Sequence, residues 1–233
     1  MKKLIKSLLI SILLLIGISI QGISQSIPRV NKPFPQFTLK SRSGNIISLS
    51  DLKGKNILLV FPRGKVGDHW CHLCHYQYAE LAKAEIEHDV RAKYNLEIIY
   101  ILPYTMDDVN TWVELFPSQM AEIQSWKDYP KDKLNPSTLA FVAAVEDVMS
   151  FSFKFDEDNP APMPFPVLAD VNHQLSTRLK LYTSNWDSYY NEQNVPTIFI
   201  LDEEGLIRFK YVSQETFDRL PASYIIDVLD RVL

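Results

Sequence analysis

The only two cysteines of the chain, Cys71 and Cys74, stand three residues apart in a segment whose pattern predicts a strand followed by a helix. Residues 57–61 (ILLVF) are apolar on both faces, which is typical of a strand that is covered on two sides. After a polar turn, apolar and polar residues recur at helical spacing from Leu73 onward. The sequence therefore predicts a cysteine pair at the N-terminus of a helix.

A helix N-terminus favours an ionised thiol, because its unpaired N–H groups and the positive end of the macrodipole stabilise a thiolate. The pKa of Cys71 should therefore fall below that of a free thiol. Cys74 lies about one turn further on the same face, within reach of a disulfide to Cys71. We expect Cys71 to be the exposed nucleophile, Cys74 to be the more buried resolving partner, and His72 between them to favour the thiolate when it is protonated.

The segment Trp70-Cys71-His72-Leu73-Cys74 resembles the Trp-Cys-x-x-Cys motif of thioredoxin-like oxidoreductases. The resemblance covers most of residues 28–233, with a gap in the middle, and points to the redoxin branch of that superfamily, also called AhpC/TSA or peroxiredoxin-like. It implies an α/β fold with a central mixed β-sheet, helices on both faces and an N-terminal β-hairpin. The segments that carry it are 61–64 (FPRG), 79–81 (AEL), 165–170 (FPVLAD) and 195–205 (VPTIFILDEEG).

In thioredoxins, the proline of such a Val-Pro-Thr segment is cis and faces the cysteines, so the resemblance assigns this place to Pro196. A cis proline leaves neighbouring backbone groups free to pair with an extended peptide. Beside the catalytic pair, the candidate groove-forming or supporting residues are therefore Trp70, His72, Val195, Pro196 and Thr197.

Two redox activities fit such a site: thiol–disulfide exchange and peroxide reduction. Peroxiredoxins break the O–O bond with a Pro-x-x-x-Thr/Ser-x-x-Cys segment and an arginine beside the later strand. Here Asp68 stands three residues before Cys71, and residues 195–197 replace that arginine, although Arg63 or Arg208 could substitute for it. We therefore predict a thiol–disulfide oxidoreductase, with a peroxiredoxin-like thiol peroxidase as the alternative.

Four other interpretations of the cysteine pair remain open. Residues 71–75 (CHLCH) satisfy the C-x-x-C-H pattern of c-type haem attachment. His69, His72 and His75 could join the thiolates around copper or zinc, although His75 should point about a turn away from His69. A structural disulfide closing so small a loop would add only roughly 2 kcal/mol. The fold could also be a redox-inactive binding module. The dithiol interpretation itself requires no cofactor and no metal.

The first 24 residues predict a cleaved signal peptide. Residues 1–6 are basic, residues 7–20 are uncharged and mostly apolar but short for a membrane span, and small residues precede Gln25. The alternative is an uncleaved segment, which would be the only contact with a membrane. We therefore expect an exported protein, periplasmic or otherwise extracytoplasmic. In such a chain a single close cysteine pair indicates chemistry rather than a disulfide scaffold.

Residues 25–233 predict one thioredoxin-like (redoxin) domain. Residues 104–164 do not belong to a minimal thioredoxin core, and they predict a helical insertion packed beside the active site, with helices at 107–116, 118–126 and 136–151. The formal charge of −4 argues against a nucleic-acid partner. The expected partners are a protein substrate with thiols or a disulfide, a thiol electron donor and, in the peroxidase alternative, hydroperoxides.

Overall fold

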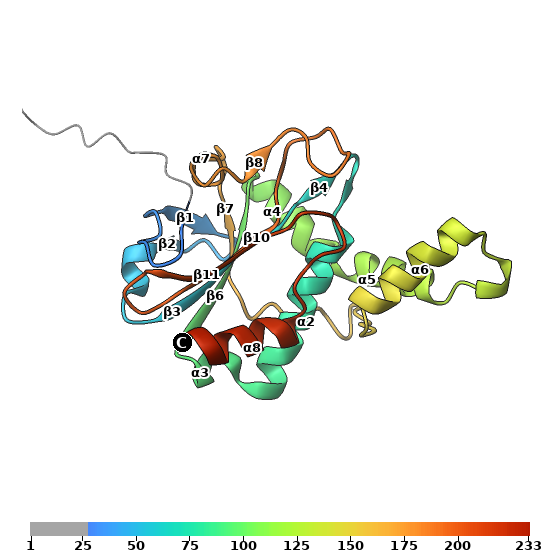
Figure 1. Cartoon of the computed structure of the whole chain (residues 1–233), viewed down its shortest axis with the longest axis horizontal. Helices are drawn as coiled ribbons and strands as arrows, with labels where there is room; N and C mark the ends of the chain where they lie inside the picture. The colour runs from blue at the N-terminus through green and yellow to red at the C-terminus, as the bar shows by residue number, and fades with distance from the viewer. Residues whose placement is uncertain (1–27) are drawn as a thin grey trace, which may run out of the picture.

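The computed structural model describes residues 28–233, which form a seven-stranded sheet with helices on both faces (Figure 1). The signal segment predicted at residues 1–24 lies outside the described residues. Across the sheet the strands follow the order β11-β10-β3-β6-β7-β1-β2. Among residues 28–233, no helix is both long and apolar enough to cross a bilayer.

The sheet is mixed, as the resemblance implies. Three parallel strands form its centre: β3 (Asn56–Phe61), β6 (Leu96–Leu102) and β7 (Val167–Ala169). The antiparallel strand β10 (Thr197–Leu201) pairs with β3 and carries β11 (Ile207–Val212) on its other side. The predicted N-terminal hairpin, β1 (Thr38–Ser41) and β2 (Ile46–Ser48), extends the sheet beyond β7.

The central strands are buried on both faces because their sequences are apolar throughout. In β3, every residue from Ile57 to Phe61 is buried, and β6 is buried except at Glu97. The crossover between these two parallel strands is α2 (His72–His88), which is followed by the short α3 (Val90–Lys93). The active-site helix is therefore held against the middle of the sheet.

The helices cover the two faces unequally. On one face α2 packs with α4 (Met106–Glu114), α5 (Phe116–Lys127) and α8 (Ala222–Val232) around the larger core cluster. The other face is covered by η1 (Leu49–Leu52), α7 (Gln174–Arg178) and Phe34 from the segment before β1. The predicted helices on both faces are thus confirmed.

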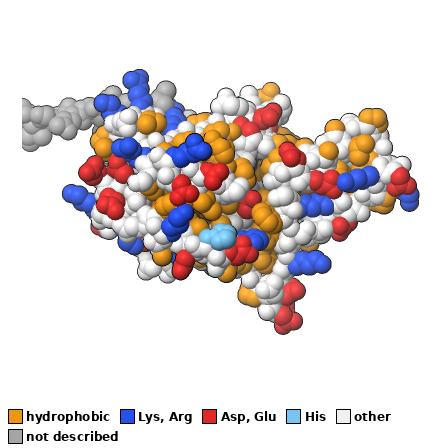
Figure 2. Space-filling view, turned by 60° about the horizontal axis from the view of Figure 1, so that its bottom comes forward, with side chains coloured by type: hydrophobic (Ala, Val, Ile, Leu, Met, Phe, Trp, Pro, Cys, Tyr) orange, Lys and Arg blue, Asp and Glu red, His pale blue; other side chains and the backbone are white. Residues whose placement is uncertain are grey.

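Between β6 and β7 the chain forms α4, α5, the short η2 (Lys131–Lys133) and α6 (Pro136–Val148). Together with the chain around it, α6 projects from the body (Figure 1), and Figure 2 shows hydrophobic side chains gathered where this arm meets the body. The predicted helices are present with shifted ends. Thr105 rather than Asp107 caps α4, because its side chain accepts a hydrogen bond from the backbone N of Asp108.

Three other segments differ from what their sequences predict. The polar turn after β3 contains a small hairpin, β4 (Lys65–Val66) and β5 (His69–Trp70). The polar and aromatic residues 182–193 predict a loop, but they hold the pair β8 (Tyr182–Thr183) and β9 (Gln193–Asn194). The apolar periodicity near the C-terminus predicts a helix over 216–233, but the helix begins at residue 222, because side-chain carboxylates bind the backbone N–H groups of residues 214–216 in a loop.

Candidate active site

The cysteine pair lies where the sequence predicts it, at the N-terminus of α2. Cys71 is the N-cap residue, and the Cys74 sulfur lies in the first turn. The backbone N of Cys71 donates a hydrogen bond to the carbonyl oxygen of Gly64 (2.8 Å), and the backbone N of Arg63 donates to the Cys74 sulfur (3.3 Å). The turn after β3 and the start of the helix therefore hold each other in place.

Gly64 allows this turn to close. Its φ is +88°, in the left-handed region, and a Cβ built on it would lie 2.2 Å from the ring of Tyr104. The hydroxyl of that tyrosine accepts a hydrogen bond from the backbone N of Lys65 (2.9 Å) and donates to the carbonyl of Glu192 (3.0 Å). Tyr104, which follows β6, thus fixes the turn beside the cysteines through the hydrogen bonds of its hydroxyl.

Both cysteines are free and buried, with 4% of Cys71 and 2% of Cys74 exposed. The prediction of an exposed Cys71 is therefore wrong. The hairpin after β3, helix α5 and the loop before α8 all contribute side chains to the space around it. Cys71 instead borders a cavity of about 440 Å³, which we call the Cys71 cavity; its lining is Arg63, Val66, His69, Cys71, His72, Leu73, Glu122, Trp126, Phe141, Met149, Tyr189, Thr216 and Phe217.

The two thiols have different acidities. Burial alone would raise the pKa of Cys71, but a hydrogen bond from the Cys74 thiol and the positive charges of Arg219 and Arg63 outweigh burial and lower this pKa to about 6. For Cys74, burial, the hydrogen bond to Cys71 and the nearby Cys71 charge raise the pKa well above the usual thiol value. Near neutral pH the pair therefore holds one thiolate, on Cys71, and one proton, on Cys74.

Arg63 is fully buried and fixed by three hydrogen bonds. Its guanidinium donates to Gln193 Oε1 (2.6 Å), to Thr216 Oγ1 (3.0 Å) and to the carbonyl of Trp186 (3.2 Å). The guanidinium also lies between the rings of Trp186 and Tyr189, at 4.7 and 4.8 Å from their centroids. Arg63, one of two candidates for the missing arginine, thus lies at the site. The other, Arg208, is exposed and 3.6 Å from Asp202.

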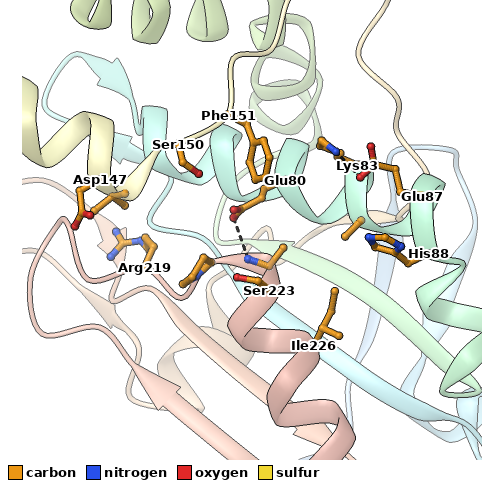
Figure 3. A pocket seen from close by; sticks show the side chains of 14 residues that line it. Glu80, Lys83, Glu87, His88, Asp147, Ser150, Phe151, Arg219, Ser223 and Ile226 are labelled. Atoms are coloured by element: carbon orange, nitrogen blue, oxygen red, sulfur yellow. Dashed lines mark hydrogen bonds and ion pairs between the residues drawn. The ribbon is translucent and has the colours of Figure 1, made fainter.

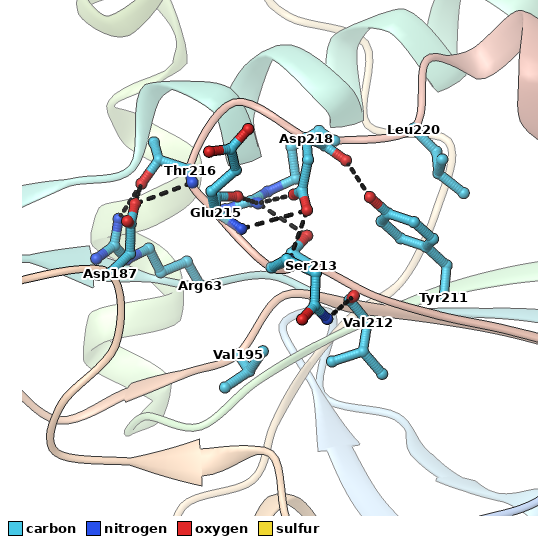
Figure 4. A network of polar contacts seen from close by, with 12 residues as sticks. Arg63, Asp187, Val195, Tyr211, Val212, Ser213, Glu215, Thr216, Asp218 and Leu220 are labelled. Atoms are coloured by element: carbon cyan, nitrogen blue, oxygen red, sulfur yellow. Dashed lines mark hydrogen bonds and ion pairs between the residues drawn. The ribbon is translucent and has the colours of Figure 1, made fainter.

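A second guanidinium, that of Arg219, was not predicted. It belongs to the loop between β11 and α8, is 8% exposed, and donates to Ser213 Oγ at 2.9 Å. Figure 4 shows the polar contacts of Ser213, Glu215 and Asp218 in this loop. Its Nε and Nη2 atoms have no hydrogen-bond partner among the described residues, and the group lies 5.5 Å from the Trp186 ring. No local pattern marks this residue, because its place depends on how the loop folds back over the cysteines.

Two other candidate residues lie at the site in different ways. His72 borders the Cys71 cavity, where its Nε2 lies 2.9 Å from Glu122 Oε2 and its ring lies 4.6 Å from that of Trp126 at an angle of 57°. Trp70 is buried and packs edge-to-face on Tyr104, with a centroid distance of 5.4 Å, but it does not line the cavity. The first contacts the cavity, and the second supports the hairpin beside it.

The segment of Val195, Pro196 and Thr197 does not border the Cys71 cavity. None of the peptide bonds between residues 28 and 233 is cis, so the expectation of a cis Pro196 is wrong. The backbone groups of this segment already form hydrogen bonds within the protein. Val195 N donates to Leu181 O (2.8 Å), and Pro196 O accepts from Ser213 N (2.9 Å). These backbone groups are therefore not free for a substrate peptide.

His69 and His72 border the same cavity as Cys71, but His75, which both the haem and the metal interpretation require, is tied up elsewhere. His75 is fully buried, with Nε2 2.7 Å from the carbonyl of Trp112 and Nδ1 3.2 Å from that of Cys71, so neither nitrogen is free to bind iron. Within the described part of the chain, no group of three or more histidine, cysteine or acidic residues is arranged to hold a metal ion.

A second cavity, of about 540 Å³, lies between α2, the start of α8 and the chain after α6 (Figure 3). Burial raises the pKa of Glu80, and its carboxylate accepts a hydrogen bond from the backbone N of Ala222 at 3.0 Å. This lining contains charges of both signs and no cysteine. Glu80 therefore caps the N-terminus of α8, and this cavity contains no redox-active thiol.

The fold and the paired thiols define the class, a thioredoxin-like thiol oxidoreductase. A sequence model of the AhpC/TSA family matches residues 30–210, and the chain belongs to this family. It is thus a peroxiredoxin-like oxidoreductase. No curated protein matches the sequence.

Solved peroxiredoxin structures share the fold at low identity. The reduced 2-Cys peroxiredoxin of Plasmodium vivax aligns with a TM-score of 0.52 and 16% identity, over 87% of this chain and 95% of that one. A cysteine-to-serine mutant of peroxiredoxin 6 of Arenicola marina gives 0.53 and 15%, over 87% and 72%. The mitochondrial 2-Cys peroxiredoxin of Plasmodium falciparum gives 0.51 and 17%, over 88% and 94%.

Proposed function

We propose that the protein is a thiol–disulfide oxidoreductase that works through the dithiol of Cys71 and Cys74. The observation that carries this proposal is the difference between the two thiols: one has a pKa of about 6 and borders a cavity, and the other is buried beside it with a raised pKa. A low-pKa nucleophile with an adjacent protonated thiol is what disulfide exchange requires.

In the reducing direction, the Cys71 thiolate attacks one sulfur of a substrate disulfide. A bond forms between these sulfurs, and the other substrate sulfur leaves as a thiolate, which takes a proton from solvent. Cys74 then loses its proton and attacks the Cys71 sulfur, so that the second substrate sulfur leaves as a thiol. The substrate gains two electrons, the protein is left with a Cys71–Cys74 disulfide, and a thiol electron donor restores the dithiol.

Two single substitutions test this proposal in an insulin-reduction assay. Cys71→Ser should abolish reduction, because it removes the attacking sulfur. Cys74→Ser should still attack but should stop at a mixed disulfide, which a mass spectrum detects. Normal insulin reduction by Cys71→Ser would exclude the proposed nucleophile.

Peroxide reduction is the second candidate, and the two buried guanidinium groups beside Cys71 favour it. The thiolate would attack the terminal oxygen of a hydroperoxide, the O–O bond would break to release water or an alcohol, and Cys71 would become a sulfenic acid. Cys74 would then displace water and form the same disulfide. If wild type and Cys71→Ser remove hydrogen peroxide at equal rates, this candidate is excluded.

Export is the remaining part of the proposal, and it rests on the basic and apolar N-terminal segment. We expect the secreted form to begin at Gln25. The full-length chain is expressed in a host that exports proteins. Mass spectrometry of the N-terminal peptide of the secreted protein then tests this expectation. A full-length N-terminus in the cytoplasmic fraction would contradict it.

A further inference from the structure

The Cys71 cavity is built in part by the segment between β6 and β7. This segment contributes Glu122 and Trp126 from α5, Phe141 from α6, and Met149 just after α6. The segment therefore forms one wall of the cavity, and none of these four residues belongs to the sheet.

Trp126 and Phe141 of this wall form an aromatic arc together with Phe217, which comes from the loop before α8. The rings of Trp126 and Phe141 lie 5.5 Å apart at 69°, and those of Phe141 and Phe217 lie 5.9 Å apart at 81°. Phe141 keeps 39% of its surface exposed, although Val142 and Val145 on the same helix are buried. An exposed aromatic ring at the rim of a cavity is typical of a contact surface.

The polar groups that line the same cavity beside the arc already have partners. Arg63 is bound by Gln193 and Thr216, and His72 faces Glu122. The arc itself therefore offers a ligand apolar contacts only, in the same cavity as the reacting sulfur of Cys71. A ligand that fills the cavity should carry an apolar group close to its reacting atom.

Phe141 belongs to the cavity lining and is also partly exposed, so the arc is open to solvent at this residue. A polypeptide disulfide could therefore place one side chain against the arc while the rest of its chain stays outside the cavity.

We propose that the arc of Trp126, Phe141 and Phe217 binds a bulky apolar side chain next to the reacting cysteine of a polypeptide disulfide. This inference rests on the proposed thiol–disulfide exchange and adds the kind of side chain that the substrate carries beside its reacting cysteine. The chemical step is the exchange described above, with the substrate disulfide as oxidant and the Cys71–Cys74 dithiol as reductant.

Two symmetrical peptide disulfides test the inference with the reduced full-length chain. The peptides are identical except for phenylalanine or serine before the cysteine. We expect the phenylalanine peptide to react with Cys71 about tenfold faster, as one filled apolar subsite allows. Phe141→Ala should reduce this preference to about twofold, whereas Phe141→Leu should keep most of it.

Tyr224→Ala is the matched control, because Tyr224 is an exposed aromatic residue of α8 that does not line the cavity. It should leave the preference unchanged. Equal rates for both peptides, or a preference that survives Phe141→Ala, would overturn the subsite while keeping the exchange activity. No reaction with either peptide would instead refute the exchange activity itself. A preference for cumene hydroperoxide over hydrogen peroxide without one between the peptides would overturn the polypeptide ligand.

Discussion

The guanidinium of Arg63 donates a hydrogen bond from Nε to Gln193 Oε1 at 2.6 Å, and both residues are fully buried. The amide of Gln193 also donates to the carbonyls of Tyr189 and Asn191, at 3.1 and 3.0 Å. One glutamine thus fixes a buried charge and the loop that stacks on it. The position of the charge beside the thiols depends on this contact.

Gln193→Leu should destabilise the protein by about 1–3 kcal/mol, because it leaves a buried guanidinium N–H without an acceptor. Urea denaturation at pH 7 measures the change. Gln119→Leu is the matched control, since Gln119 is also buried but its Oε1 has no hydrogen-bond partner among the described residues. A similar cost for both substitutions would show that the loss reflects glutamine burial rather than the contact with Arg63.

The ionisation of Cys71 should follow the charge of Arg219. In the wild type, the rate of alkylation by iodoacetamide should rise with pH around a midpoint of about 6, because only the thiolate reacts. Arg219→Met removes a lowering charge, so the midpoint should move up by about 1 pH unit. Arg208→Met, at an exposed arginine on β11, should leave it at the wild-type value. An unchanged midpoint in Arg219→Met would contradict the electrostatic role.

The sequence predicts best what short-range patterns determine. The apolar run of β3 and the helix that follows Cys71 are confirmed because each depends on neighbours along the chain. The fold followed from these elements and from the motifs between them.

The exposure of Cys71 and the charges around it depend on contacts between distant segments. Trp126, Phe141 and Phe217 come from segments far along the chain and line one cavity with the cysteine. The charge of Arg219 acts on it from a loop where the sequence pattern predicts a helix. Neither periodicity nor spacing reports such contacts. The buried cysteine and the second guanidinium could therefore be found only in the fold.

Because of His75, the free energy of unfolding should decrease at acidic pH. Burial lowers the pKa of its imidazole to about 4, against backbone contacts that raise it, whereas the unfolded chain takes up this proton near the usual 6.5. The contribution is therefore complete above about pH 6.5 and is lost as the pH falls toward 4, by about 3 kcal/mol for a shift of this size. Urea midpoints measured between pH 7 and pH 4 test the slope.

His75→Gln removes this titration and should show a shallower decline, although it should be less stable at pH 7 by about 1–2 kcal/mol because the contact with Trp112 O is weakened. His88→Gln, at the exposed end of α2, should keep the wild-type decline. If His75→Gln declines as steeply as the wild type, the acid sensitivity comes from other groups.

Gly64→Ala should disrupt the turn that holds the cysteines. Alanine is strained at the φ of +88°, and its methyl group would meet the Tyr104 ring at 2.2 Å.

Gly44→Ala provides the comparison, since Gly44 has nearly the same φ of +90° but nothing within 4 Å of its Cβ position. Gly44→Ala should therefore show the backbone strain alone, about 1–2 kcal/mol. Gly64→Ala should exceed that cost by about 1–3 kcal/mol, as expected for an overpacked core. Because the carbonyl of Gly64 accepts the N–H of Cys71, the alkylation midpoint of Cys71 should also move in Gly64→Ala and not in Gly44→Ala. Equal losses of stability in the two variants, with unchanged midpoints, would mean that the Tyr104 ring moves aside without disturbing the cysteine pair.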